Sequence, residues 1–246
     1  MTPALALAGI RKSFGGLPAT NDVSLEVAAG ERRLIMGPNG AGKTTLFNLI
    51  SGDLRADAGS IRIFGREVSR MKPHQRARCG LARTYQIITL FQKDSLEHNV
   101  VLALLGLSRD RWRAFRPLAA HAALFGEARR VLARVGLERS AARGVGEVSY
   151  GDRRRLEIAL ALAQSPRLLL LDEPLAGLSA EERSAVSALI ASIPRETTVV
   201  MIEHDMDRAL ELAERITLLH YGQVIVEGTR AEVVAHPMTR EIYLGH

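Results

Sequence analysis

Residues 37–44 read Gly-Pro-Asn-Gly-Ala-Gly-Lys-Thr, and they match the pattern G-x4-G-K-[ST]. Residues 33–36 before them predict a strand, and residues 44–50 after them predict a helix that ends at Gly52. Glycines between a strand and a helix let backbone N–H groups converge on phosphate oxygens, and the helix N-terminus adds the positive end of its dipole. The stretch therefore predicts a phosphate site on a strand–loop–helix unit, the alternative being a glycine turn that only caps a helix.

Acidic residues follow two other predicted strands. Residues 168–171 and 198–202 are continuous apolar runs, as expected for central parallel strands that are covered on both faces. The first run ends in Asp172-Glu173 and the second in Glu203-His204-Asp205. Because ligands in open α/β sheets bind at the carboxyl ends of the strands, we expect these acids near the glycine loop. A strand that simply leaves the core is the alternative.

The residue types at these strand ends suit phosphoryl transfer to water. Lys43 is expected to reach the β and γ phosphates, and the hydroxyl of Thr44 to hold Mg2+ together with Asp172. Glu173 is expected to polarise the attacking water, and His204 to orient that water or the γ-phosphate. Glu173 and His204 are therefore the expected catalytic pair, although a lone histidine at a strand end also serves as a packing or capping residue.

The remaining pattern predicts an α/β fold with a parallel-sheet core. Further short strands are expected over residues 5–8, at a sheet edge, and over 23–27 and 60–64, and a hairpin over 215–220 and 223–227. Apolar residues recur at helical spacing over 96–104 and over 124–135. Capping boxes at Ser179/Glu182 and Thr229/Glu232 predict the starts of two more helices.

Composition is that of an ordinary globular domain and excludes a disordered or fibrous chain. The 246 residues are 47% hydrophobic and 24% charged, with one cysteine and a net charge of +6. A single cysteine favours a reducing compartment, and no apolar run approaches the roughly 20 residues of a membrane span. The positive charge raises nucleic acid or anionic membrane surfaces as partners, but most arginines are spread along the chain as on a solvated surface. Residues 109–116 form a basic run with interleaved aromatics, which suits lipid headgroups, a membrane subunit or an exposed connection.

The order of the motifs resembles that of an ATP-binding cassette of the ABC superfamily. The matching segments are residues 37–44, 148–152 (Val-Ser-Tyr-Gly-Asp), 168–173, 176–179 (Ala-Gly-Leu-Ser) and His204. Within the superfamily the chain most resembles the ATPase subunits of branched-chain amino acid importers. That closer resemblance rests on residues 12–17 (Lys-Ser-Phe-Gly-Gly-Leu), 83–86 (Arg-Thr-Tyr-Gln), 149–151, 154–159 (Arg-Arg-Leu-Glu-Ile-Ala) and 202–206 (Ile-Glu-His-Asp-Met).

The resemblance implies a P-loop NTPase (RecA-like) parallel-sheet core with an antiparallel β subdomain and an α-helical subdomain. One nucleotide-binding domain would span residues 1–246, with the helical subdomain at about 90–160. The residues expected to bind ATP are Phe14, Gly37, Pro38, Asn39, Gly40, Ala41, Gly42, Lys43, Thr44, Thr45, Gln86, Ser149 and Gly151, and those expected to hold Mg2+ are Thr44, Gln86 and Asp172.

Three of these roles come from the resemblance alone. Phe14 matches the aromatic that stacks on adenine, although it would serve equally as a core residue, and Gln86 matches a glutamine that contacts Mg2+. Ser149 and Gly151 match the signature loop, which in this family closes on ATP held by a second cassette. From spacing alone, Ser149 is also a helix cap paired with Asp152. Val148 and Asp152 depart from the usual leucine and glutamine of that loop.

The resemblance also implies a cellular role. It implies an ATPase on the cytoplasmic face of a membrane that powers an importer through separate permease subunits. It further implies a second cassette, an indirect link to a solute-binding protein and no nucleic acid. An exporter-type cassette such as the lipopolysaccharide-extracting ATPase, and a soluble cassette acting on nucleic acid or ribosomes, are the alternatives.

Overall fold

A six-stranded sheet forms the centre of the computed structural model, which describes residues 2–85, 90–108, 121–203 and 210–244. Its strands are β3 (Arg32–Met36), β6 (Leu81–Arg83), β7 (Leu168–Asp172), β8 (Thr198–Ile202), β9 (Arg215–His220) and β10 (Gln223–Gly228). Their order is β10-β9-β3-β8-β7-β6, and every neighbouring pair is parallel except β10 and β9. One strand, β8, therefore separates the strand before the glycine loop from the strand that ends in Asp172.

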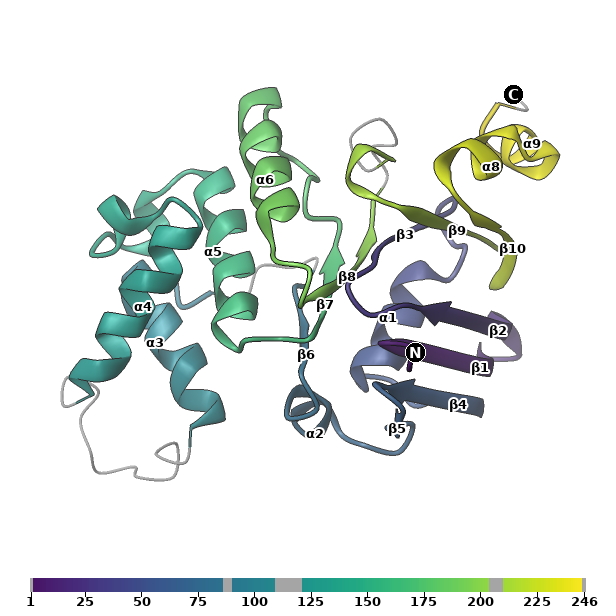
Figure 1. The fold of residues 1–246 in the computed structure, drawn as a ribbon, viewed down its shortest axis with the longest axis horizontal. Helices are drawn as coiled ribbons and strands as arrows, with labels where there is room; N and C mark the ends of the chain where they lie inside the picture. The colour runs from purple at the N-terminus through teal and green to yellow at the C-terminus, as the bar shows by residue number, and fades with distance from the viewer. Residues whose placement is uncertain (1, 86–89, 109–120, 204–209, 245–246) are drawn as a thin grey trace.

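An antiparallel sheet packs beside the central one (Figure 1). Its order is β2-β1-β4-β5, with β1 at Leu5–Phe14, β2 at Leu17–Val27, β4 at Ala58–Ile63 and β5 at Arg66–Glu67. The expectation that residues 5–8 form an edge strand is wrong, because β1 pairs with β2 on one side and with β4 on the other. The alternating apolar residues of β1 fit either position, and only the pairing partners distinguish them.

The apolar side chains divide into two clusters, one on each face of the central sheet. Ile35 of β3 joins the cluster formed with the antiparallel sheet and α1 (Lys43–Ser51). Its neighbours Leu34 and Met36 join the cluster formed with α5 (Tyr150–Ala163) and α6 (Ala180–Ser192). This alternation along fully buried strands explains why β7 and β8 are almost wholly apolar and why β3 is apolar from Leu34 to Met36, after the buried Arg32 and Arg33.

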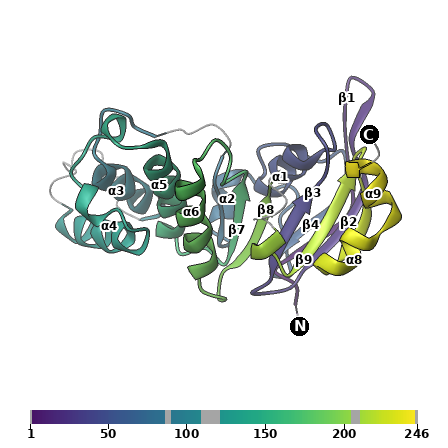
Figure 2. The same ribbon diagram turned by 90° about the horizontal axis from the view of Figure 1, so that it is seen from above.

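Helices lie at both ends of the elongated molecule (Figures 1 and 2). At one end α3 (Leu96–Leu107) and α4 (Ala122–Arg134) pack with α5, joined by short 3₁₀ turns at Glu138–Ser140 and Val145–Glu147. The other end carries α8 (Arg230–Ala235) and α9 (Pro237–Leu244), while α2 (Pro73–Ala77) precedes β6. Within the residues that the structure describes, none of these helices has the length and apolar character needed to cross a bilayer.

Local sequence signals fix several element boundaries. Ser179 and Thr229 cap α6 and α8 with reciprocal bonds to Glu182 and Glu232, which confirms both predicted capping boxes. The helix after the glycine loop ends at Gly52, which adopts the left-handed conformation. The predicted strands of the central sheet and the predicted hairpin are also confirmed, and with them the α/β fold of the P-loop type.

Candidate functional site

The glycine loop runs from the end of β3 to the start of α1, and two of its glycines are sterically required. A Cβ at Gly37 would lie 2.2 Å from the carbonyl oxygen of Leu219, and a Cβ at Gly42 would lie 2.2 Å from that of Ala19. Gly42 also has a φ of 97°, a conformation that other residues rarely adopt. The loop is therefore clamped between β9 and β2, so its backbone N–H groups are held in place before any ligand arrives.

Lys43 is the first residue of α1, and its ammonium group folds back over the loop. Its Nζ donates hydrogen bonds to the carbonyl oxygens of Gly37 (2.7 Å) and Pro38 (3.0 Å). The side chain is buried, and this burial lowers the pKa of Lys43, against the opposing effect of Glu173 and Asp172. The same ammonium is thus within electrostatic reach of both acids at the end of β7.

A cavity of about 280 Å³ opens above the loop. It is lined by Ala19, by residues 39–45 and by Glu173. The structure therefore brings together most of the residues expected to bind phosphate with the acid expected to polarise water, although they lie about 130 positions apart in sequence. This follows from the sheet order, because the carboxyl ends of β3 and β7 meet at one edge.

Asp172 ends β7 and is almost fully buried. Its Oδ2 accepts a hydrogen bond from Nη2 of Arg83 at 2.9 Å, and its backbone N–H donates to the hydroxyl of Thr84 at 3.2 Å. Burial raises the pKa of Asp172, and Arg83 opposes that rise. Among the described residues, its other oxygen, Oδ1, has no hydrogen-bond partner. A buried carboxylate oxygen left without a donor fits a Mg2+ site, because Mg2+ binds through carboxylates and hydroxyls.

Glu173 follows β7 and turns the chain toward the cavity. It has a φ of 47°, and its backbone N–H donates to the carbonyl of Ile202 at the end of β8. The buried carboxylate of Glu203 accepts a hydrogen bond from the backbone N–H of Leu175 at 2.6 Å. The ends of β7 and β8 are therefore tied together on both sides of Glu173, in a left-handed conformation that costs energy for a glutamate.

Two interactions at this edge of the sheet were not predicted from the sequence. Arg83 belongs to a segment that carries the family resemblance. Its ion pair with Asp172, however, follows only from the adjacency of β6 and β7. Glu203 follows the apolar strand β8, and an acid at a strand end is a signal that can be seen in the sequence. Its bond to Leu175 needed the tertiary structure, since the two residues lie far apart in sequence.

Ser149 and Gly151, the residues predicted to form the signature loop, lie at the N-terminus of α5. The hydroxyl of Ser149 accepts a hydrogen bond from the N–H of Asp152, as expected for a cap. The return bond of a capping box is not made, because the Asp152 carboxylate pairs with Arg155 instead. The N–H of Gly151 donates to Oε1 of Glu182 on α6 at 3.0 Å. Ser149 and Gly151 do not line the cavity at the glycine loop.

Of the remaining predicted site residues, Phe14 lies in the part of the chain that the structure describes, whereas Gln86 and His204 do not. Phe14 is 48% exposed, with Nζ of Lys12 lying 5.4 Å from its ring centroid, so the alternative of a core phenylalanine is wrong. It does not line the cavity at the glycine loop. Gln86 and His204 lie outside the described residues, as does the basic run 109–116, and their roles stay predictions.

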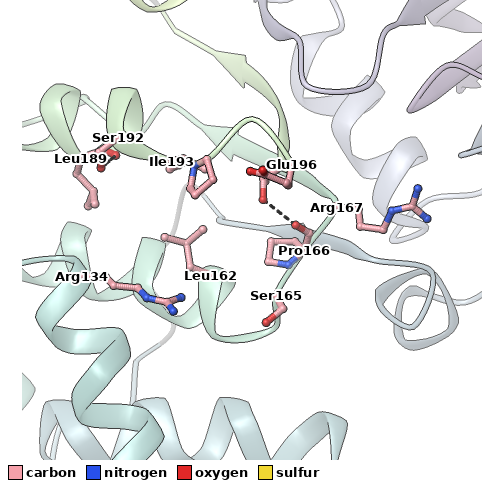
Figure 3. A pocket seen from close by; sticks show the side chains of 11 residues that line it. Arg134, Leu162, Ser165, Pro166, Arg167, Leu189, Ser192, Ile193 and Glu196 are labelled. Atoms are coloured by element: carbon pink, nitrogen blue, oxygen red, sulfur yellow. Dashed lines mark hydrogen bonds between the residues drawn. The ribbon is translucent and has the colours of Figure 1, made fainter. Parts of the chain in front are cut away.

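A larger cavity of about 670 Å³ lies at the opposite edge of the sheet (Figure 3). Its walls are mainly apolar, from Leu162, Leu189 and Ile193, and a hydrogen bond from the Thr197 hydroxyl to the Pro166 carbonyl closes one side. It sits where β7 and β8 begin rather than where they end. Arg134 and Arg167 also line this cavity, but it shares no residue with the cavity above the glycine loop and is not the predicted phosphate site.

Comparison with known proteins agrees with this geometry. The model of the ABC transporter family matches residues 20–176, a span that includes the glycine loop and Glu173. The high-affinity branched-chain amino acid transport ATP-binding protein BraF of Pseudomonas aeruginosa is 37% identical, over 99% of this chain and 98% of BraF. The lipopolysaccharide export system ATP-binding protein LptB of Acidithiobacillus ferridurans is 36% identical, over 100% of this chain and 98% of LptB.

Solved structures place the fold in the same group. The ADP conformation of MJ1267, an ATP-binding cassette of an ABC transporter, superposes with a TM-score of 0.89 at 28% identity and covers 100% of both chains. The likeness extends over the antiparallel sheet and the helices as well as the central sheet. The chain therefore belongs to the ABC transporter family, as one of its ATP-binding cassette ATPases.

Proposed function

We propose that this ATPase powers an importer for branched-chain amino acids or related small solutes. The observation that carries the proposal is the cavity where residues 39–45 and Glu173 converge, combined with nearly full-length similarity to a branched-chain amino acid transport ATP-binding protein. In this assignment the chain works on the cytoplasmic face of a membrane with separate permease subunits. Cargo reaches those subunits from a solute-binding protein and never contacts the cassette.

The described residues divide the work of hydrolysis among them. Backbone N–H groups of residues 39–45 and the ammonium of Lys43 bind the phosphates, and Lys43 exchanges its loop carbonyls for phosphate oxygens. Thr44 and Oδ1 of Asp172 would hold Mg2+, which neutralises charge on the β and γ phosphates when bound. Glu173 accepts a hydrogen bond from the attacking water and aligns it with the γ-phosphorus.

Coupling to transport requires two cassettes. ATP on the glycine loop of one chain would contact Ser149 and Gly151 of the other, so that binding closes the pair and hydrolysis reopens it. A ligand shifts such an equilibrium only through its different affinity for the two states, and a nucleotide that bridges two chains provides that difference.

The test is the Glu173→Gln variant of the purified chain. It should lose nearly all turnover and accumulate an ATP-bound dimer, as measured by phosphate release and by sedimentation. Glu196→Gln is the matched control, since Glu196 is an exposed acid at the opposite edge of the sheet. Near-normal turnover in Glu173→Gln would refute the assignment of Glu173.

A second candidate is a lipopolysaccharide-exporting cassette, which the similarity to LptB favours. The two functions differ in their membrane partners. Reconstitution of the chain in vesicles with the permeases of a branched-chain amino acid importer, and separately with those of a lipopolysaccharide exporter, distinguishes them. Stimulation of ATPase activity by a binding protein loaded with leucine supports import, whereas stimulation by lipopolysaccharide alone supports export.

A further inference from the structure

The carboxylate of Glu182 links two segments that both belong to the nucleotide machinery. Its Oε1 accepts the N–H of Gly151 at 3.0 Å, and its Oε2 accepts the N–H of Ser179 at 3.1 Å. The hydroxyl of Ser149 caps the same turn of α5, where it accepts the N–H of Asp152. Because α5 and α6 lie side by side, one side chain in the first turn of α6 reaches the start of α5 (Figures 1 and 2). We call this group, Ser149, Gly151, Ser179 and Glu182, the clasp.

The clasp is closely packed. A Cβ at Gly151 would lie 2.7 Å from Oε1 of Glu182, so a larger residue here would push the Glu182 carboxylate away from this position. Next to it, the ring of Tyr150 lies 3.3 Å from the position of a Cβ at Gly177, in the turn that follows Glu173. The start of α5 therefore lies against the segment that follows β7.

One donor of the clasp, the N–H of Gly151, belongs to a residue that the proposed function assigns to the ATP of the second chain. One N–H makes one strong hydrogen bond, so Gly151 cannot serve both a carboxylate and a phosphate. The N-terminus of α5 is an anion site by its dipole and free N–H groups, and here a carboxylate of the chain itself occupies it. The backbone N–H groups of Ser179 and Gly151 lower the pKa of Glu182, so the occupant is an anion at neutral pH.

We propose that Glu182 is a built-in competitor of ATP, which occupies the signature loop in the separated chain and must be displaced by the γ-phosphate on a second copy. The inference rests on the proposed pairing of two cassettes. The competition sets a threshold ATP concentration for closure of the two cassettes. Each signature loop must lose its hydrogen bond to the Glu182 carboxylate before it can gain one to the nucleotide. Closure then requires ATP. ADP lacks the γ-phosphate that would displace Glu182, so it leaves the clasp intact.

Glu182→Gln tests the proposal with little disturbance of the fold. Glutamine keeps the N3 position of the capping box with Ser179 but replaces the anionic acceptor by a neutral one. The ATP concentration at half-maximal dimerisation should fall about fivefold, the difference between a charge-assisted and a neutral hydrogen bond. Glu182→Asp is a second variant, which keeps the charge on a side chain too short to bond Gly151, and it should also lower the threshold.

The chain supplies a matched control in α8. Glu232 occupies the same N3 position, and its Oε2 accepts the N–H of Thr229 at 2.7 Å, but it makes no bond to α5. Glu232→Gln therefore reports the loss of a capping charge alone. All variants are compared in the Glu173→Gln background by sedimentation over an ATP titration, with the unfolding midpoint recorded for each.

The outcomes separate this inference from the proposed function. A lower threshold for both Glu182 variants, with Glu232→Gln unchanged, supports the competitor role. If the Glu173→Gln chain dimerises and the Glu182 variants match it or need more ATP, the competitor role fails while the paired cassette stands. If no variant dimerises with ATP, both are overturned.

Discussion

Arg83 holds Asp172 from the neighbouring strand, with Nη2 of the arginine 2.9 Å from Oδ2 of the aspartate and both side chains at most 4% exposed. The other guanidinium nitrogen, Nη1, donates to Asn48 at 2.7 Å and to Ser51 at 2.9 Å, near the end of α1. One side chain therefore connects the proposed metal carboxylate to the helix that begins at Lys43. This arginine therefore links the two halves of the proposed nucleotide site.

Removal of that arginine should destabilise the fold. Arg83→Ala leaves the Asp172 carboxylate buried without its cation, and breaking a buried pair in this way costs about 3–5 kcal/mol of unfolding free energy. Urea denaturation measures the change. Arg62→Ala is the control, because the Arg62–Glu67 pair is solvent-exposed and should contribute at most about 1 kcal/mol. Equal losses for the two variants would contradict a structural role for Arg83.

The phosphate loop and its neighbouring strands are predictable from sequence because their signals are local. A glycine pattern, an apolar run and a capping box each concern residues within a few positions of one another, as at Ser179 and Glu182. The functions of Arg83, Glu203 and Glu182 depend on which strands and helices become neighbours, which no local pattern encodes. The same reason explains why β1 was expected at an edge and lies inside its sheet.

Gly40 and Gly42, two of the three glycines with positive φ in the glycine loop, should respond differently to alanine. Gly42→Ala places a Cβ 2.2 Å from the Ala19 carbonyl, whereas at Gly40, with a φ of 81°, nothing lies within 4 Å of the added atom. Gly40→Ala therefore has only the backbone strain, about 1–2 kcal/mol, and Gly42→Ala must also displace β2 or the loop. Binding of a fluorescent ATP analogue should be lost in Gly42→Ala and retained, though weakened, in Gly40→Ala. Equal binding by the two variants would show that the Ala19 contact does not hold the loop.

Asp152 stands where the resemblance predicts the glutamine of a signature loop, and its charge is already compensated. Its carboxylate pairs with Arg155, whose Nη1 also bonds the carbonyl of Val135. Asp152→Gln should leave turnover intact or raise it, because the substitution removes an acid near the incoming phosphate. Steady-state phosphate release with the membrane partners present measures this effect. A large loss of turnover would mean that Asp152 takes part in the reaction.

Stability should depend on pH through Glu157, a buried acid in α5. Its carboxylate pairs with Arg154 at 2.8 Å, yet burial outweighs this pair and raises the pKa of Glu157 from 4.5 to about 7. Between those two values the folded chain binds more protons at this site than the unfolded chain, so the unfolding free energy falls as pH rises. The stabilisation from protonated Glu157 is fully present below the unfolded pKa of 4.5. It decreases as the pH rises to the folded pKa of about 7, and above that pH the unfolding free energy changes no further through this group.

Glu157→Gln removes the titrating carboxyl. The quantity compared between the parent chain and the variant is therefore the slope of the unfolding free energy against pH, rather than its absolute value. The unfolding free energy of the parent chain, relative to that of the variant, should fall from pH 5 to pH 7 by up to about 1.4 kcal/mol per pH unit. Glu127→Gln in α4 is the control, because Glu127 pairs with Arg130 at the same spacing on an exposed surface. Urea denaturation at several pH values gives the slopes. Parallel curves for the parent and Glu157→Gln would mean that Arg154 keeps the glutamate charged throughout, and that the ion pair at the centre of α5 outweighs its burial.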